Sequence, residues 1–222
     1  MTMLYDVLKD LLGTYGSTAI CVVLCIVVPY LLGSVNFALV ISKIFYHDDI
    51  RKHGSGNAGM TNMLRTYGKL AAAGTLLCDM LKASVSVWFG MLIFGYIGGY
   101  IAGLFCILGH IFPIFFKFKG GKGVATTAAM VLTLDPVCFL CLIAVFIVLV
   151  ATTKYVSLGS IICCMLYPLI TYNLATWGQG FSVLISFVVA AVVIFMHREN
   201  IKRLRNHTEN KISFSKKNKE KK

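Results

Sequence analysis

Seven long apolar runs constrain this sequence more than any other feature. They cover residues 17–45, 70–94, 97–116, 124–134, 137–151, 156–172 and 181–196. A bilayer core offers the backbone no hydrogen-bond partner, so such runs form helices, and about 20 residues are needed to cross it. The prediction is an all-α, polytopic membrane bundle of about seven transmembrane helices. The fourth and fifth runs are short, and the first is interrupted at Pro29 and at Gly33-Ser34, where a kink or break is expected.

The composition is typical of a membrane protein that binds anions. Hydrophobic residues make up 58% of the chain, and 21 Lys and Arg stand against 9 Asp and Glu, for a formal net charge of +12. The charges lie between apolar runs and in a tail, so membrane lipids or phosphorylated small molecules fit better as partners than nucleic acid. We therefore expect no nucleic-acid partner.

Basic residues occupy alternate connections between the runs. They lie in residues 46–69, around Phe118, at Lys154 and from His197 onward, whereas the connections at 95–99, 135–136 and 173–180 carry almost none. The positive-inside rule then predicts an outside N-terminus and a cytoplasmic C-terminus. We expect a multi-pass protein of the cell inner (plasma) membrane, with one domain over residues 1–209 and a basic, disordered tail over 210–222.

The strongest local signal is the segment 117–126, which reads KFKGGKGVAT and opens into an apolar run. Glycines let a backbone approach an anion and expose its N–H groups, a helix N-terminus adds partial positive charge, and Lys122 adds a full one. Thr126 adds a hydroxyl donor. The spacing differs from a Walker A loop, so nucleotide hydrolysis is not expected. The alternative is an interfacial turn whose lysines reach lipid headgroups.

Two more polar segments lie on the same predicted side. Residues 51–62 read RKHGSGNAGMTN, a segment dense in donors, although an ordinary flexible loop has similar residues. Residues 197–204 read HRENIKRL, and on a helix His197, Asn200 and Arg203 share one face. The alternative there is a solvated basic helix end.

The second run contains Asp79 and Lys82, three residues apart. Ionisable side chains at membrane depth are costly and normally pair or face a polar cavity. We expect a structural ion pair between them, and the alternative is a direct role in binding substrate.

In the order 51–65, 109–126 and 197–209, these segments resemble the bacterial acyl-phosphate:glycerol-3-phosphate acyltransferase family, and the similarity runs over residues 33–209. The motifs that carry it are HIFP at 110–113, GGKGVAT at 120–126 and HRENIKRL. The sequence departs from the usual family pattern at Asn36, Ala38, Met60 and His207, which stand in place of Pro, Gly, Ala and Gly.

The resemblance implies a seven-helix acyltransferase of phospholipid biosynthesis. It would move a fatty acyl group from acyl phosphate, not from acyl-CoA or acyl carrier protein, to the 1-hydroxyl of glycerol 3-phosphate, giving lysophosphatidic acid and phosphate. The active site would face the cytoplasm. No cofactor or metal is expected, and the soluble enzyme that makes acyl phosphate is an expected partner.

The expected site divides between the two substrates. The acyl-phosphate head would be held by Ser34, Asn57, Gly120, Gly121, Lys122, Gly123, Val124, Ala125 and Thr126. Glycerol 3-phosphate would be held by Arg51, Ser157, Ser160, His197 and Asn200. The catalytic set would be Lys122, His197 and Asn200, with either His197 or the departing phosphate accepting the proton. The rival function is a membrane transporter or channel for an anionic phosphorylated metabolite, although the two halves show no inverted repeat.

Overall fold

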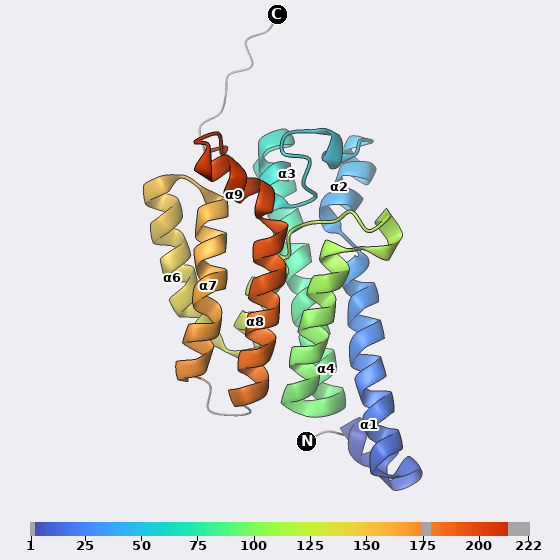
Figure 1. Ribbon diagram of the computed structural model, residues 1–222. Helices are drawn as coiled ribbons and strands as arrows, with labels where there is room; N and C mark the ends of the chain where they lie inside the picture. The colour runs from blue at the N-terminus through green and yellow to red at the C-terminus, as the bar shows by residue number, and fades with distance from the viewer. Residues whose placement is uncertain (1–2, 175–178, 213–222) are drawn as a thin grey trace, which may run out of the picture.

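The computed structural model describes residues 3–174 and 179–212, which form a bundle of helices and contain no strand (Figure 1). Single-turn 3-10 helices cover Ile50–Lys52 and Ile114–Phe116. The α-helices are α1 (Met3–Ser34), α2 (Phe37–Tyr46), α3 (Met60–Thr66), α4 (Lys69–Ile111), α5 (Val124–Leu134), α6 (Pro136–Thr153), α7 (Val156–Leu174), α8 (Gln179–Met196) and α9 (Arg198–Arg205). The all-α prediction is confirmed.

Helix α4 is a hairpin of two antiparallel arms and accounts for two of the predicted runs. The backbone leaves the helical region at Phe94 and at Gly95, which has φ 62°. Gly90 and Gly98 then lie so close that a Cβ on either would overlap the carbonyl oxygen of the other. Because glycine has no Cβ, Gly90 and Gly98 let the two arms pack this closely beside the turn.

Each predicted run corresponds to a helical segment. Four segments are long and apolar enough to cross a membrane: Leu4–Tyr46, Lys69–Phe116, Pro136–Thr153 and Val156–Leu174. Residues Gly180–Met196 join them if they are counted with Arg198–Arg205 across a 58° bend. Helix α5 has only 11 residues. The chain is thus built as a multi-pass membrane protein, and the total of about seven spans stays a prediction.

The helix does not break at the first of the two expected positions, Pro29. This residue lies inside α1 and does not end the helix, because membrane helices tolerate one missing backbone donor when neighbours pack around it. The break occurs at the other predicted position, after Ser34, and two residues separate it from the start of α2. Helix α1 also starts earlier than expected, at Met3, with a kink at Gly13 (φ 70°).

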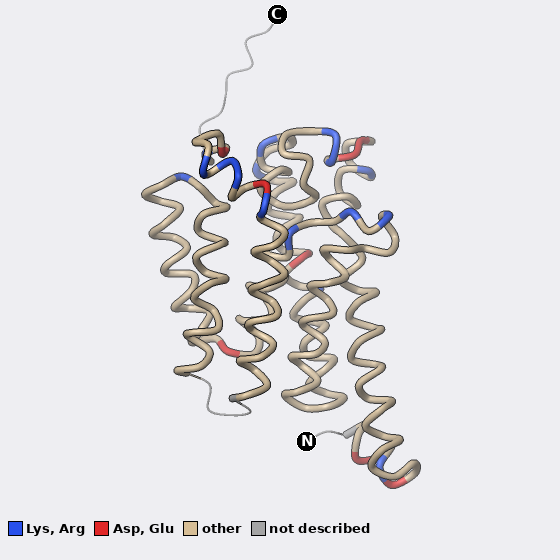
Figure 2. The backbone as a smooth tube through the Cα atoms, viewed as in Figure 1, with Lys and Arg blue, Asp and Glu red and all other residues tan. Residues whose placement is uncertain are grey.

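The basic connections gather at one end of the bundle, as the charge pattern predicted. In Figure 2 nearly all Lys and Arg lie at the end that carries α2, α3 and α9, and the opposite end, with the hairpin turn of α4, carries few. Residues 210–212 are described and lie at this basic end, whereas the predicted disordered tail from residue 213 onward lies outside the described residues.

Candidate active site

A cavity of about 410 Å³ opens among α3, α4, α5, α6, α7 and the junction of α8 with α9. Its lining is divided by chemistry. The polar side chains at the basic end include Asn57, Thr61, Arg65, Lys122, Ser157, Ser160, His197, Asn200 and Glu209. The apolar wall deeper in the bundle is formed by Val131, Phe139, Leu142, Ile143, Phe146, Cys163, Cys164 and Tyr167. From Ser157 to Tyr167 along α7 the wall extends about 15 Å at 1.5 Å per residue.

A hydrogen-bonded chain of side chains closes the polar end. The Lys122 ammonium donates to Asn200 Oδ1, and Asn200 Nδ2 donates to Glu209 Oε1 over 2.8 Å. Ser157 Oγ donates to the same Glu209 oxygen over 3.1 Å, and Arg203 Nε donates to Glu209 Oε2 over 2.8 Å. Three segments far apart in sequence therefore meet here, as the resemblance implied for Lys122, Ser157 and Asn200.

The electrostatics of this end favour an anionic ligand. Burial, and then repulsion from Arg203, lower the pKa of Lys122 to about 8, so it is mostly protonated at neutral pH. Burial opposes ionisation of Glu209, but hydrogen bonds from Arg203, Asn200 and Ser157 outweigh it and lower the pKa of that carboxyl. Lys122, Arg65 and Arg203 all interact electrostatically around Glu209, and the other carboxylate of the lining, Asp79, is paired with Lys82, which leaves positive charge for a phosphate.

His197 is neutral and its tautomer is fixed. Burial lowers the pKa of His197 to about 4, although the contact with the Val193 carbonyl opposes this. His197 Nδ1 lies 2.7 Å from Val193 O, and because a carbonyl oxygen only accepts, Nδ1 carries the proton. Nε2 is then an acceptor in a residue that lines the cavity.

The glycine-rich turn differs from expectation at Gly120 and Gly121. Their N–H groups do not point at an anion: Gly120 N donates to Ile111 O and Gly121 N donates to His110 O, both over 3.1 Å. The turn folds against the end of α4 so closely that a Cβ on Gly121 would overlap His110 Nε2. The expectation of exposed N–H groups is therefore wrong for these two residues, because both N–H groups donate to carbonyls at the end of α4. Gly123, Val124 and Ala125 do line the cavity.

Three other predicted residues also lie outside the cavity lining and hold neighbouring segments. Arg51 pairs with Asp49 over 2.7 Å and donates from Nη1 to Phe116 O and Lys119 O, so it ties its loop to the glycine-rich turn. Ser34 Oγ donates to Tyr30 O and accepts from Ile114 N over 3.4 Å. Thr126 is fully buried and donates to Gly123 O.

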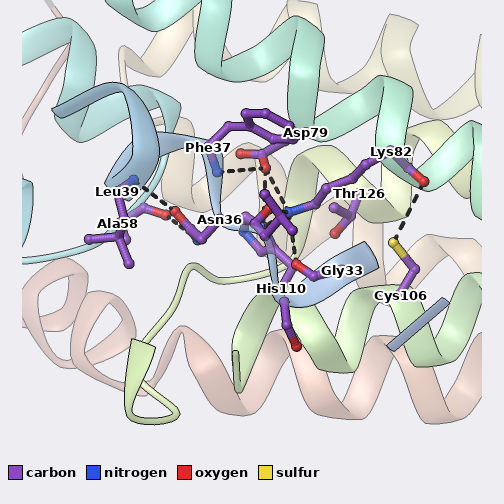
Figure 3. Close-up of polar contacts among 12 residues, drawn as sticks. Gly33, Asn36, Phe37, Leu39, Ala58, Asp79, Lys82, Cys106, His110 and Thr126 are labelled. Carbon is purple, nitrogen blue, oxygen red and sulfur yellow. Dashed lines mark hydrogen bonds and ion pairs between the residues drawn. The ribbon is translucent and has the colours of Figure 1, made fainter. Parts of the chain in front are cut away.

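The predicted ion pair of Asp79 and Lys82 forms, over 2.8 Å, and it sits in the break between α1 and α2 (Figure 3). Lys82 Nζ also donates to Gly33 O over 2.9 Å and to Val35 O over 2.6 Å, while Asp79 Oδ1 lies 3.5 Å from Phe37 N. The cation thus meets the free carbonyls that end α1, and the carboxylate meets the first turn of α2.

His110 connects this ion pair to the active site. Its Nδ1 lies 3.1 Å from Lys82 Nζ and 3.5 Å from Asp79 Oδ1, and both His110 and Asp79 line the cavity. Its carbonyl accepts from Gly121 of the glycine-rich turn. The break in α1 and the turn before α5 are therefore fixed to the same buried polar cluster.

Sequence reasoning gave no site role to Glu209 or Arg65, which both line the polar end. Glu209 follows α9 and reaches the site only because the chain turns back, so no helical spacing reveals it. Arg65 was visible as a basic residue in a donor-rich segment. Within residues 3–174 and 179–212, no group of three His, Cys, Asp or Glu side chains is placed to hold a metal ion.

Comparison with known proteins gives a consistent result. The sequence model of the glycerol-3-phosphate acyltransferase family matches residues 23–207. A glycerol-3-phosphate acyltransferase of Bacillus cereus (strain G9842) is 45% identical over 197 residues, 88% of this chain and 98% of the relative. One from Thermoanaerobacter sp. (strain X514) is 41% identical over 190 residues, 86% and 95% of the two chains.

Two solved structures are also similar. The crystal structure of PlsY (YgiH), an integral membrane glycerol 3-phosphate acyltransferase, in its glycerol 3-phosphate form has a TM-score of 0.81 at 34% identity, covering 86% of this chain and 96% of that one. Its lysophosphatidic acid form has a TM-score of 0.78 at 33% identity, with coverage of 86% and 95%. Together with the two-ended cavity, these matches show that the chain is a multi-pass membrane enzyme that belongs to the glycerol-3-phosphate acyltransferase family.

Proposed function

We propose that the enzyme transfers the acyl group of acyl phosphate to the 1-hydroxyl of glycerol 3-phosphate and releases lysophosphatidic acid and phosphate. The observation that carries the proposal is the cavity, which joins a cationic end to an apolar wall. Acyl phosphate has a phosphate head on a long apolar chain, and glycerol 3-phosphate is a second anion. The similar PlsY structures, in glycerol 3-phosphate and lysophosphatidic acid forms, support a site that takes both the polar acceptor and the lipid product.

The lining supports a division of labour. We place the acyl-phosphate head against Lys122, Asn57 and the first turn of α5 at Gly123, Val124 and Ala125, because a helix N-terminus and an ammonium both stabilise a departing phosphate. Ser34, Gly120, Gly121 and Thr126 then shape the turn that presents these groups. Ser157, Ser160, His197 and Asn200 would hold glycerol 3-phosphate, with Arg51 fixing the loop beside it.

The reaction needs no covalent enzyme intermediate, because acyl phosphate is already activated. The acceptor hydroxyl oxygen attacks the acyl carbon, the bond from that carbon to the phosphate oxygen breaks, and phosphate leaves with the electron pair. We assign the hydroxyl proton to the departing phosphate. His197, with a pKa of about 4, is a weak base, but its Nε2 can accept a hydrogen bond that orients the hydroxyl. Positioning of this kind contributes several kcal/mol to catalysis, about 7–11 in the best cases.

We further propose that the site faces the cytoplasm at the inner (plasma) membrane and receives acyl phosphate from the soluble enzyme that makes it. Lys and Arg gather at the end of the bundle that holds the polar end of the cavity, and this distribution supports the orientation (Figure 2). The same end carries the loops between α2 and α3 and the turn before α5.

The test is incorporation of labelled glycerol 3-phosphate into lipid by detergent-purified protein, with acyl phosphate, acyl-CoA or acyl carrier protein thioester as donor. Turnover is expected only with acyl phosphate, and it should fall by at least about 100-fold in Lys122→Ala and Asn200→Ala. The matched controls Lys52→Ala and Asn173→Ala replace exposed residues outside the cavity and should keep full activity. Turnover with a thioester donor, or none with acyl phosphate across several chain lengths, would contradict the proposal.

A further inference from the structure

The chain after α9 turns back across the polar mouth of the cavity. The turn passes through His207 in a left-handed conformation (φ 56°). Beyond it, Asn210 O accepts a hydrogen bond from Arg65 over 3.1 Å, and Ile212 N donates to Lys154 O over 2.8 Å. Residues 207–212, called here the return segment, therefore run from α3 to the turn before α7.

Glu209 is the residue of the return segment that enters the site. Its side chain is only 5% exposed, and its carboxylate accepts hydrogen bonds from Asn200, Ser157 and Arg203. Buried carboxylates are stable only when fully paired, so these three donors are held in one arrangement around it.

This arrangement has a consequence for Asn200. A carboxamide can present either its oxygen or its NH₂ group in a given direction, and its partners decide which. Because ionised Glu209 can only accept, the NH₂ of Asn200 turns to Glu209 and the oxygen turns to Lys122, whose ammonium donates to it. We propose that Glu209 is a positioning residue that fixes the Asn200 amide, and through it the Lys122 ammonium, in the orientation used for acyl transfer. The inference rests on the proposed function of Lys122 and Asn200.

The charges that face Lys122 give this role a distinctive readout. Arg65 from α3, Arg203 from α9 and Glu209 act on it directly, and Asp79 and His110 of α4 and His197 line the same cavity. Glu209 raises the pKa of Lys122, and Arg203 lowers it. Protonated Lys122 is the active form, so activity is lost as pH rises through its pKa. Removing Glu209 should move that loss to lower pH, and removing Arg203 should move it to higher pH.

The experiment measures kcat/KM for glycerol 3-phosphate from pH 6 to 9.5 in wild type, Glu209→Gln, Arg203→Gln and the control Glu199→Gln. Gln keeps an acceptor oxygen but loses the charge. In Glu209→Gln the ratio of kcat/KM at pH 8.5 to that at pH 6.5 should fall by about sixfold, which corresponds to lowering the pKa of Lys122 from about 8 by one unit. In Arg203→Gln that ratio should rise. Glu199 is exposed on α9, so its variant should follow wild type although it removes the same charge ten residues away.

A purely structural role for Glu209 would lower kcat/KM by the same factor at every pH, or change only the thermal stability, and either result would overturn the inference. The inference would also be overturned if Glu209→Gln and Arg203→Gln both shifted the loss of kcat/KM at high pH in the same direction. If Glu209→Gln does not fold, the direction of the shift in Arg203→Gln decides. Absence of acyl-phosphate turnover in wild type would count against the proposed function, whereas an active wild type with unshifted variants counts against the positioning role alone.

Discussion

Replacing Lys82 by Met tests whether the buried ion pair holds the active-site end together. Met has nearly the length of Lys but donates no hydrogen bond. The change removes the donor to Gly33 O and Val35 O at the end of α1, and it takes from the Asp79 carboxylate its ammonium partner. All three acceptors lie in a region where water is scarce, since Lys82 and Asp79 are buried.

The magnitude follows from these contacts. A buried carbonyl that loses its only strong donor costs about 1–3 kcal/mol. Removing one partner of a buried ion pair costs about 3–5 kcal/mol. The terms overlap, because Asp79 can take up a proton once Lys82 is gone, so we expect a loss of at least about 3 kcal/mol in the free energy of unfolding. The double variant Asp79→Asn with Lys82→Met should cost less than the two single changes together, by about 2 kcal/mol.

The assay is reversible unfolding by denaturing detergent in mixed micelles, followed by circular dichroism. Lys69→Met is the matched control, because Lys69 is exposed at the start of α4, and it should change stability by less than about 0.5 kcal/mol. A Lys82→Met protein within about 1 kcal/mol of wild type would refute the reasoning. So would strict additivity in the double variant.

Three further changes test the site. Gly121→Ala should lower kcat by at least about tenfold, since the new Cβ would overlap His110, whereas Gly74→Ala on α4 meets only an ordinary contact at 3.6 Å and should be neutral. His197→Gln should raise KM for glycerol 3-phosphate but keep kcat within about threefold; a loss of about 100-fold would make His197 the base. Ala128→Phe should raise KM for long-chain acyl phosphates more than for short ones because Ala128 lines the cavity, while Leu140→Phe, at a 62% exposed position on α6, should not. Equal KM changes across chain lengths would contradict the last expectation.

The helices and the ion pair could be predicted because local rules fix them. Apolar runs in a bilayer have almost no alternative to helix, and Asp79 and Lys82 share a helix face at a spacing of three. The break at Gly33-Ser34 was visible for a similar reason, since small residues there allow the chain to change direction, whereas Pro29 was tolerated within α1. His207 occupies a left-handed position, where glycine fits best.

The features of the site that could not be predicted depend on which distant segments of the chain come into contact. The sequence could not show that the N–H groups of Gly120 and Gly121 would donate to carbonyls at the end of α4, because that requires knowing how the turn packs. Nor could it show that Glu209 would enter the site, since the residue follows α9 and has no periodic relation to its partners. The same applies to Arg51, whose guanidinium donates to carbonyls more than 60 residues away along the chain.

The break between α1 and α2 has a consequence for how the chain is assembled in the membrane. Gly33 and Val35 are synthesised well before Asp79 and Lys82, so the carbonyls that end α1 meet their cation only after the first arm of α4 has entered the bilayer. Until then the break would expose unpaired backbone groups to lipid, which is unfavourable by several kcal/mol per group, on the order of 4. The first membrane segment therefore completes its native shape only together with the α4 hairpin, and insertion of these two elements should be coupled.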